Sequence, residues 1–133
     1  NGFLKLFKSH RAEYKDGEQK RDFVYIKDCV AVILQLIDKR SVNGIFNLGS
    51  GTARSWNDLA AAVFNAMGRE KKIEYFDMPQ QLIGSYQYFT QANMQKLNSV
   101  GISVQNTALE DGVRDYVQNY LIPGELKLQD RQN

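Results

Sequence analysis

The sequence predicts a mixed α/β fold, in an irregular α+β arrangement of four short strands and four helices. Short apolar runs bounded by turn residues alternate with longer segments in which apolar residues recur at the helical period. Four strands are too few for a complete doubly wound sheet. The 133 residues, of which 43% are hydrophobic and 24% charged, are typical of one soluble globular domain.

Four apolar runs are typical of short strands, because each is too short for a helix and lies beside turn or charged residues. These runs are Leu4–Phe7, Asp22–Ile26, Ile45–Leu48 and Ile73–Phe76. A polar stretch from Lys8 to Arg21, with a turn signal at Asp16–Gly17, separates the first two. Loops of about a dozen residues inside a compact domain are usually functional or disordered.

The segment after the second run predicts a helix that starts at Cys29. The carboxylate of Asp28 is placed to cap this helix by accepting bonds from its first backbone N–H groups. The apolar positions recur at i, i+3, i+4 and i+7 spacing, and they are Val30, Ile33, Leu34 and Ile37. A helix with so wide an apolar face is expected to be largely buried.

Three later helices carry start or stop signals of their own. Ser55 and Asp58 resemble a capping box for a helix over residues 56–67, with Gly68 just after its end. Thr90 is the expected N-cap of a helix over residues 91–99.

The last helix is predicted after residue 107. A capping box of Thr107 and Glu110 begins it, and Pro123–Gly124 ends it. One domain is therefore expected at residues 1–124, followed by a polar C-terminal tail at residues 125–133.

The bulk charge and hydropathy exclude several partners. The net charge of +2, from 17 basic and 15 acidic residues, is nearly balanced and gives no case for nucleic acid. No apolar run approaches the ~20 residues of a membrane span, and the first residues do not resemble a signal peptide. We therefore expect a cytoplasmic protein with no membrane partner.

Motifs of several catalytic classes are absent. No tyrosine has a lysine four residues after it, so the Tyr-x-x-x-Lys dyad of short-chain dehydrogenases is missing. His10 is the only histidine, which argues against a histidine-based metal site. Gly49–Ser50–Gly51 lies where a dinucleotide-binding turn would lie, but a third glycine is missing. A tight turn is the favoured interpretation of these glycines.

Basic and aromatic residues flank the long polar loop: Phe7, Lys8, His10, Arg11, Lys20 and Arg21. If the strands on either side of the loop lie side by side, these charges converge at one edge. Arginine can bind phosphate oxygens through two N–H groups, and an aromatic ring can stack on a base. The cluster could therefore hold a nucleoside diphosphate, although a solvated loop would have the same composition. For the aromatic segment at residues 84–89, core packing is favoured over ligand contact.

Two strings in the sequence point to a known family. Arg21–Asp28, R-D-F-V-Y-I-K-D, and Gly44–Gly51, G-I-F-N-L-G-S-G, resemble strings of the extended short-chain dehydrogenase/reductases, the nucleotide-sugar epimerases and dehydratases. Tyr86–Asn93, Y-Q-Y-F-T-Q-A-N, and the start Lys5–His10 are similar to the ADP-L-glycero-D-manno-heptose 6-epimerases. The resemblance, which runs to about Leu121, implies the C-terminal, substrate-binding part of such an enzyme.

The resemblance implies an N-terminal, NADP-binding Rossmann domain that these 133 residues do not contain, with NAD as the alternative cofactor. The catalytic dyad is expected in that domain, so the fragment is expected to be inactive alone. The implied reaction is oxidation at C6 of ADP-glycero-manno-heptose by NADP and return of the hydride to the opposite face, for lipopolysaccharide core heptose synthesis. An ADP-sugar is the expected ligand, in a homo-oligomeric enzyme.

The resemblance also implies substrate contacts for particular residues. The strand-end residues that line the ADP-sugar site are Phe7, Lys8, Ser9 and His10. Arg21 matches the arginine that holds the diphosphate region, and Tyr86 matches a tyrosine that reaches the substrate. No catalytic, cofactor-binding or metal-binding residue is expected within this chain.

Two other interpretations stay open. The chain could serve another nucleotide-sugar epimerase, dehydratase or reductase, or it could be a free-standing nucleotide-binding or interaction module without chemistry. In isolation the domain is expected to expose the apolar face that would pack on the Rossmann half, and to form dimers or larger assemblies through it.

Overall fold

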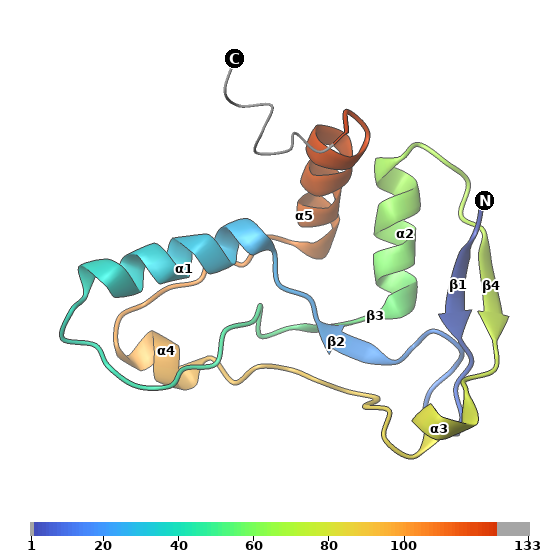
Figure 1. Ribbon diagram of the computed structural model, residues 1–133, viewed down its shortest axis with the longest axis horizontal. Coiled ribbons are helices and arrows are strands. Elements are labelled where there is room, and N and C mark those ends of the chain that lie inside the picture. The colour runs from blue at the N-terminus through green and yellow to red at the C-terminus, as the bar shows by residue number, and fades with distance from the viewer. Residues whose placement is uncertain (1, 125–133) are drawn as a thin grey trace.

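The computed structural model describes residues 2–124 of the chain (Figure 1). Four strands in this part form two two-stranded sheets. Strand β1 (Leu4–Phe7) pairs in parallel with β4 (Ile73–Phe76), and β2 (Lys20–Asp22) pairs antiparallel with β3 (Ala53–Ser55). No larger parallel sheet of the Rossmann kind occurs among the described residues, which agrees with the predicted mixed fold.

Helices supply most of the regular structure. Figure 1 shows α2 beside α5, with the β1–β4 sheet on the far side of α2 and with α1 and α4 together at the opposite end. The helices are α1 (Ile26–Asp38), α2 (Trp56–Ala66), α3 (Gln80–Ile83), α4 (Gln95–Ser99) and α5 (Leu109–Tyr116), which continues as the π-helical turn η1 (Val117–Leu121).

The buried core is small. One cluster joins α1 to α4 through Val32, Leu97 and Ile102, each no more than 2% exposed. A second set of buried apolar side chains lies on α2, and it comprises Ala60, Ala62, Phe64 and Ala66. Each fully buried large apolar side chain contributes about 1.5 to 3 kcal/mol. The α1–α4 cluster and the buried side of α2 therefore lie in different parts of the molecule.

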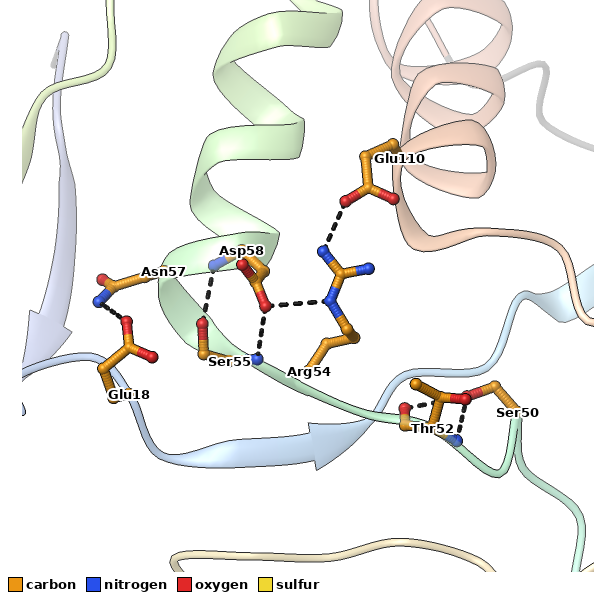
Figure 2. A network of polar contacts seen from close by, with 8 residues as sticks. All are labelled: Glu18, Ser50, Thr52, Arg54, Ser55, Asn57, Asp58 and Glu110. Carbon is orange, nitrogen blue, oxygen red and sulfur yellow. Dashed lines mark hydrogen bonds and ion pairs between the residues drawn. The ribbon is translucent and has the colours of Figure 1, made fainter. Parts of the chain in front are cut away.

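The predicted start of α2 is confirmed. The Ser55 hydroxyl accepts a bond from the Asp58 N–H at 3.1 Å, and the Asp58 carboxylate accepts one from the Ser55 N–H at 3.1 Å (Figure 2). Gly68 follows the helix with a φ of +62°, a conformation that glycine adopts without strain. The predictions of β1 and β4 are confirmed as well.

The predicted caps of α1 and α5 are wrong. Helix α1 starts at Ile26, and the Asp28 carboxylate instead accepts bonds from the Thr107 N–H at 2.8 Å and the Thr107 hydroxyl at 2.7 Å. Helix α5 starts at Leu109 with no side-chain cap. The residues that could have capped the two helices bond each other, so a tertiary interaction replaces two local ones.

The prediction that α1 is buried is also wrong. Its apolar side chains Val30, Ile33, Leu34 and Ile37 are 48% to 61% exposed. Among residues 2–124 only the opposite side of the helix packs against the core, through Val32. We call the four exposed side chains the α1 stripe.

The second and third predicted strands differ from the structure. The Asp22–Ile26 run ends as a strand at Asp22, and its last residue already belongs to α1. Residues 45–48 form no strand at all, although Phe46 and Leu48 pack against the α1–α4 core. A strand needs a neighbouring strand to satisfy its backbone, and the described residues place none beside this segment.

Helices α3 and α4 were not located correctly from sequence. The predicted helix over residues 91–99 begins only at Gln95, after Met94, and Thr90 does not cap it. Helix α3 is a single turn that no sequence pattern predicted. None of the described helices is long and apolar enough to cross a membrane. The predicted tail, 125–133, lies outside the described residues.

Candidate functional site

Three of the predicted site residues meet at one ring. The Phe7 and Tyr86 rings contact edge to face with centroids 5.9 Å apart, and the Arg21 guanidinium carbon lies 5.1 Å from the centre of the Tyr86 ring. Strands β1 and β2 do not pair with each other, so the expected side-by-side strands are not what unites these residues. Tyr86 unites them.

The segment that carries Tyr86 is held beside β2 by its backbone. The Lys20 N–H donates to the Tyr88 carbonyl at 2.8 Å, and the Thr90 N–H donates to the Lys20 carbonyl at 3.3 Å. Residues two apart in an extended segment point to the same side. Tyr86 and Tyr88 do so, since their rings contact edge to face at 5.6 Å.

The long loop is anchored on Tyr88, which is only 4% exposed. The Tyr88 hydroxyl accepts a bond from the His10 N–H at 2.8 Å. The Arg11 guanidinium carbon lies 4.6 Å from the centre of the Tyr88 ring, and the Tyr14 ring lies 5.2 Å from it. The loop is therefore a fixed part of the surface rather than a freely solvated segment. Of the aromatic segment, Tyr88 packs inside while Tyr86 stays partly exposed.

The three residues after Phe7 form bonds to groups other than Arg21 and the Tyr86 ring. The Lys8 ammonium pairs with the Asp77 carboxylate at 3.3 Å, an exposed ion pair of the kind that contributes at most about 1 kcal/mol. The Ser9 N–H donates to the Asp16 carboxylate at 2.8 Å. His10 bonds Tyr88 through its backbone, and its side chain is exposed.

A buried glutamine joins the two ends of the loop. Gln19 is 1% exposed, and its side-chain amide donates to the carbonyls of Phe7 at 3.4 Å and Lys8 at 3.3 Å. The backbone carbonyl of Gln19 accepts a bond from the Trp56 N–H at 3.2 Å, which ties the loop to the start of α2. No sequence pattern marks this role, because the partners are carbonyl groups of other segments.

The predicted turn at Asp16–Gly17 is held against α2. Gly17 has a φ of +73°, and an added Cβ atom would lie 2.7 Å from the Asn57 side-chain carbon. The Asn57 amide donates to the Asp16 carbonyl at 2.9 Å. It also donates to the Glu18 carboxylate at 2.6 Å (Figure 2). Only glycine provides both the backbone angle and the space at this position.

The loop Gly49–Ser50–Gly51 encloses the carboxylate of Asp22. That carboxylate accepts bonds from the Ser50 N–H at 2.7 Å, the Ser50 hydroxyl at 2.6 Å, the Gly51 N–H at 3.0 Å and the Ala92 N–H at 2.9 Å. Burial raises the pKa of Asp22, but the hydrogen bonds from Ser50, Ala92 and Gly51 outweigh burial and hold it below 3.8. Asp22 thus fastens the end of β2 to two other segments.

This arrangement does not fit a dinucleotide at the glycine turn. The backbone N–H groups of Ser50 and Gly51 already bind an anion, the Asp22 carboxylate. A Cβ atom on Gly49 would lie 2.6 Å from the Ala92 Cβ, so the turn is also filled on that side. The interpretation of the glycines as a tight turn is confirmed, and residues 2–124 provide no phosphate cradle of the Rossmann type at this turn.

A second polar network, formed by Arg54, Asp58 and Glu110, joins the start of α2 to α5. Figure 2 shows Arg54, which follows the glycine turn, donating to the Asp58 carboxylate at 3.0 Å and to the Glu110 carboxylate at 2.6 Å. The bonds to Glu110 and Asp58 raise the pKa of the Arg54 guanidinium, so the group is cationic at any physiological pH. This network joins α2 to α5 and holds the start of α2 in place.

The cavities lie elsewhere. An apolar cavity of about 600 Å³ lies among the first turn of α1, α2 and α5, and it includes Leu59, Val63, Leu109 and Val113 in its lining. A polar one of about 480 Å³ lies near Gly51 and Gln91. Neither of these two cavities is lined by a predicted site residue; among those residues His10 is exposed, and the other five are partly buried. The part of the chain that the structure describes holds no group of three or more residues suited to a metal ion.

Known proteins of one family are similar to this chain in sequence. Residues 4–49 match the NAD dependent epimerase/dehydratase family. The ADP-L-glycero-D-manno-heptose-6-epimerase of Nitratidesulfovibrio vulgaris is 56% identical over 120 residues, which are 90% of this chain and 37% of that protein. This chain therefore spans well under half the length of that relative.

Two solved structures share the fold. The ADP-L-glycero-D-manno-heptose-6-epimerase of Helicobacter pylori is 27% identical, with a TM-score of 0.68 over 88% of this chain and 32% of that one. The UDP-N-acetylglucosamine 4-epimerase of Methanobrevibacter ruminantium is 19% identical, with a TM-score of 0.72 over 91% of this chain and 35% of that one, a likeness of fold alone. Over residues 4–49 the chain is thus similar to the NAD dependent epimerase/dehydratase family, and over most of its own length it is similar to part of an ADP-L-glycero-D-manno-heptose-6-epimerase.

Proposed function

We propose that this chain supplies the ADP-sugar-binding part of an ADP-glycero-manno-heptose 6-epimerase. The observation that carries the proposal is the contact of Phe7 and Arg21 with one ring, that of Tyr86. Phe7 and Tyr86 lie in strings that resemble this group of enzymes, and Arg21 lies in a string that resembles the wider family of nucleotide-sugar epimerases and dehydratases. The 56% identity to the Nitratidesulfovibrio vulgaris enzyme supports the same assignment.

The geometry suits a diphosphate. One Arg21 nitrogen donates to the Lys20 carbonyl at 2.8 Å, and the guanidinium plane contacts the Tyr86 ring. The remaining N–H groups can bind two oxygens of one phosphate side by side, which is the strong form of this interaction. Lys8, Ser9 and His10, at the end of β1, are proposed to line the rest of the ADP-sugar.

The redox chemistry is proposed to lie in another part of the complete protein. This chain has no Tyr-x-x-x-Lys sequence, and its glycine turn holds Asp22 instead of a phosphate. The family is NAD dependent by description, and we propose NADP for this enzyme, with NAD as the alternative. The proposal includes a cytoplasmic homo-oligomer that serves lipopolysaccharide core heptose synthesis.

The test is the replacement Arg21→Ala in the complete protein that carries this chain. Two charge-assisted hydrogen bonds are lost, and each contributes about 1.5 to 3 kcal/mol. Titration calorimetry should therefore show ADP binding weakened by about 100-fold or more. Arg40→Ala, just after α1 and exposed, is the matched control and should leave binding unchanged.

Two results would count against the proposal. Unchanged ADP affinity and turnover in Arg21→Ala would remove the role of Arg21. Faster turnover of a UDP- or GDP-sugar than of ADP-heptose by the parent protein would assign it to another nucleotide-sugar enzyme.

A further inference from the structure

A second arginine lies on the neighbouring tyrosine. The Arg11 guanidinium carbon is 4.6 Å from the centre of the Tyr88 ring, closer than Arg21 is to Tyr86. Arg11 belongs to the basic cluster at the long loop, although the strings that resemble the epimerases do not include it. A stacked guanidinium keeps the N–H groups at its edge free to bind in the plane.

The backbone around Arg11 is fixed before any ligand arrives. The Ser9 hydroxyl accepts a bond from the Arg11 N–H at 3.1 Å and donates to the Arg11 carbonyl at 2.9 Å. The same carbonyl accepts a bond from the Tyr14 N–H at 3.2 Å, and His10 is bonded to the Tyr88 hydroxyl. A side chain on a backbone held in this way loses less entropy when it binds a ligand.

The charge of Arg11 has no counter-ion in the structure. Three carboxylates in or after the strands and loop of the site bond other groups: Asp16 accepts from Ser9, Glu18 accepts from Asn57, and Asp77 pairs with Lys8. Among residues 2–124 no carboxylate forms an ion pair with Arg11. An unpaired guanidinium that is held in place and exposed is suited to bind an anion from solution.

Arg11 and Arg21 share one pair of rings. Arg21 lies on Tyr86, Arg11 lies on Tyr88, and these two rings contact each other at 5.6 Å. We propose that Arg11 is a second anion-binding residue of this site, so that the diphosphate of the ligand is held by two arginines. The proposal rests on the proposed function, because it takes the ligand to be an ADP-sugar.

The experiment compares four variants of the complete protein by calorimetric titration with ADP at several salt concentrations. Arg11→Gln should weaken ADP binding by about tenfold or more. It should also make the affinity less dependent on salt, because one charge contact is gone. Arg11→Lys keeps the charge and should restore part of the affinity. Arg21→Gln and Arg40→Gln serve as the positive and negative controls.

The outcomes separate the two proposals. If Arg21→Gln weakens binding while Arg11→Gln stays within twofold of the parent, the role of Arg11 is refuted and the proposed function stands. Weakened binding in Arg11→Gln with an unchanged salt dependence would also refute anion binding by Arg11, since a purely structural role of this residue predicts that result. If the parent itself does not bind ADP, the proposed function fails.

Discussion

The carboxylate of Asp22 is the most connected polar group near the site, so its replacement tests the whole arrangement. One oxygen accepts bonds from the Ser50 N–H and hydroxyl, and the other accepts from the N–H groups of Gly51 and Ala92. Asp22→Asn keeps the size of the side chain. It removes the charge and replaces one of the two acceptor oxygens with an NH2 donor.

The expected loss in the free energy of unfolding follows from the hydrogen bonds that Asp22→Asn removes. With the amide nitrogen toward Gly51 and Ala92, two backbone N–H groups at 3.0 and 2.9 Å face a donor. With the amide flipped, the Ser50 N–H at 2.7 Å loses its acceptor instead. A hydrogen bond to a charged group contributes about 1.5 to 3 kcal/mol. Because water can reach part of the site, we expect a loss of about 2 to 4 kcal/mol in the free energy of unfolding.

Urea unfolding followed by far-UV circular dichroism measures this loss. Asp38→Asn, at the exposed end of α1, is the matched control and should change the stability by less than about 0.5 kcal/mol. If Asp22→Asn unfolds within about 0.5 kcal/mol of the parent, the carboxylate does not hold the three segments together. The glycine turn would then owe its shape to something other than the bound carboxylate.

Two further outcomes are expected from the surface of the molecule. Hydrogen bonds from Lys27, at 2.6 Å, and from Tyr25 lower the pKa of Asp115 from 3.8 to about 2. The ionised Asp115 carboxylate therefore stabilises the folded chain above pH 3.8, and this stabilisation is lost as the pH falls toward 2. Asp115→Asn should flatten that part of the stability curve in urea titrations between about pH 2 and 5, and an unchanged slope would contradict this. The isolated chain is also expected to associate through the α1 stripe. Ile33→Lys with Ile37→Lys should reduce the mass seen by light scattering, whereas a monodisperse parent monomer would argue against association.

Features that depend on neighbouring residues could be predicted from the sequence. The capping box of Ser55 and Asp58 is an example, because both partners lie within one helical turn. The turn at Gly17 is another, since the left-handed backbone there requires glycine whatever surrounds it. Among the site residues, the two strings around Arg21 and Tyr86 identified a pair that the structure brings into contact.

Features that depend on distant partners could not be predicted. Asp28 has the position of an N-cap, yet it bonds Thr107, 79 residues further along the chain. Thr90 likewise has the pattern of an N-cap, but its N–H bonds the Lys20 carbonyl and the helix begins later. In both cases a group far along the chain binds the residue, and the local pattern does not show that partner.

The sequence by itself determined the family resemblance, the mixed fold and the local ends of α2, because these follow from motifs and from bonds between near neighbours. Only the tertiary structure decided that Asp22 fills the glycine turn, that Tyr88 anchors the long loop, and that Arg11 lies over the Tyr88 ring. It also decided that the α1 stripe faces outward. A periodic apolar pattern shows that a helix has an apolar side, but the elements packed around it determine whether that side is covered.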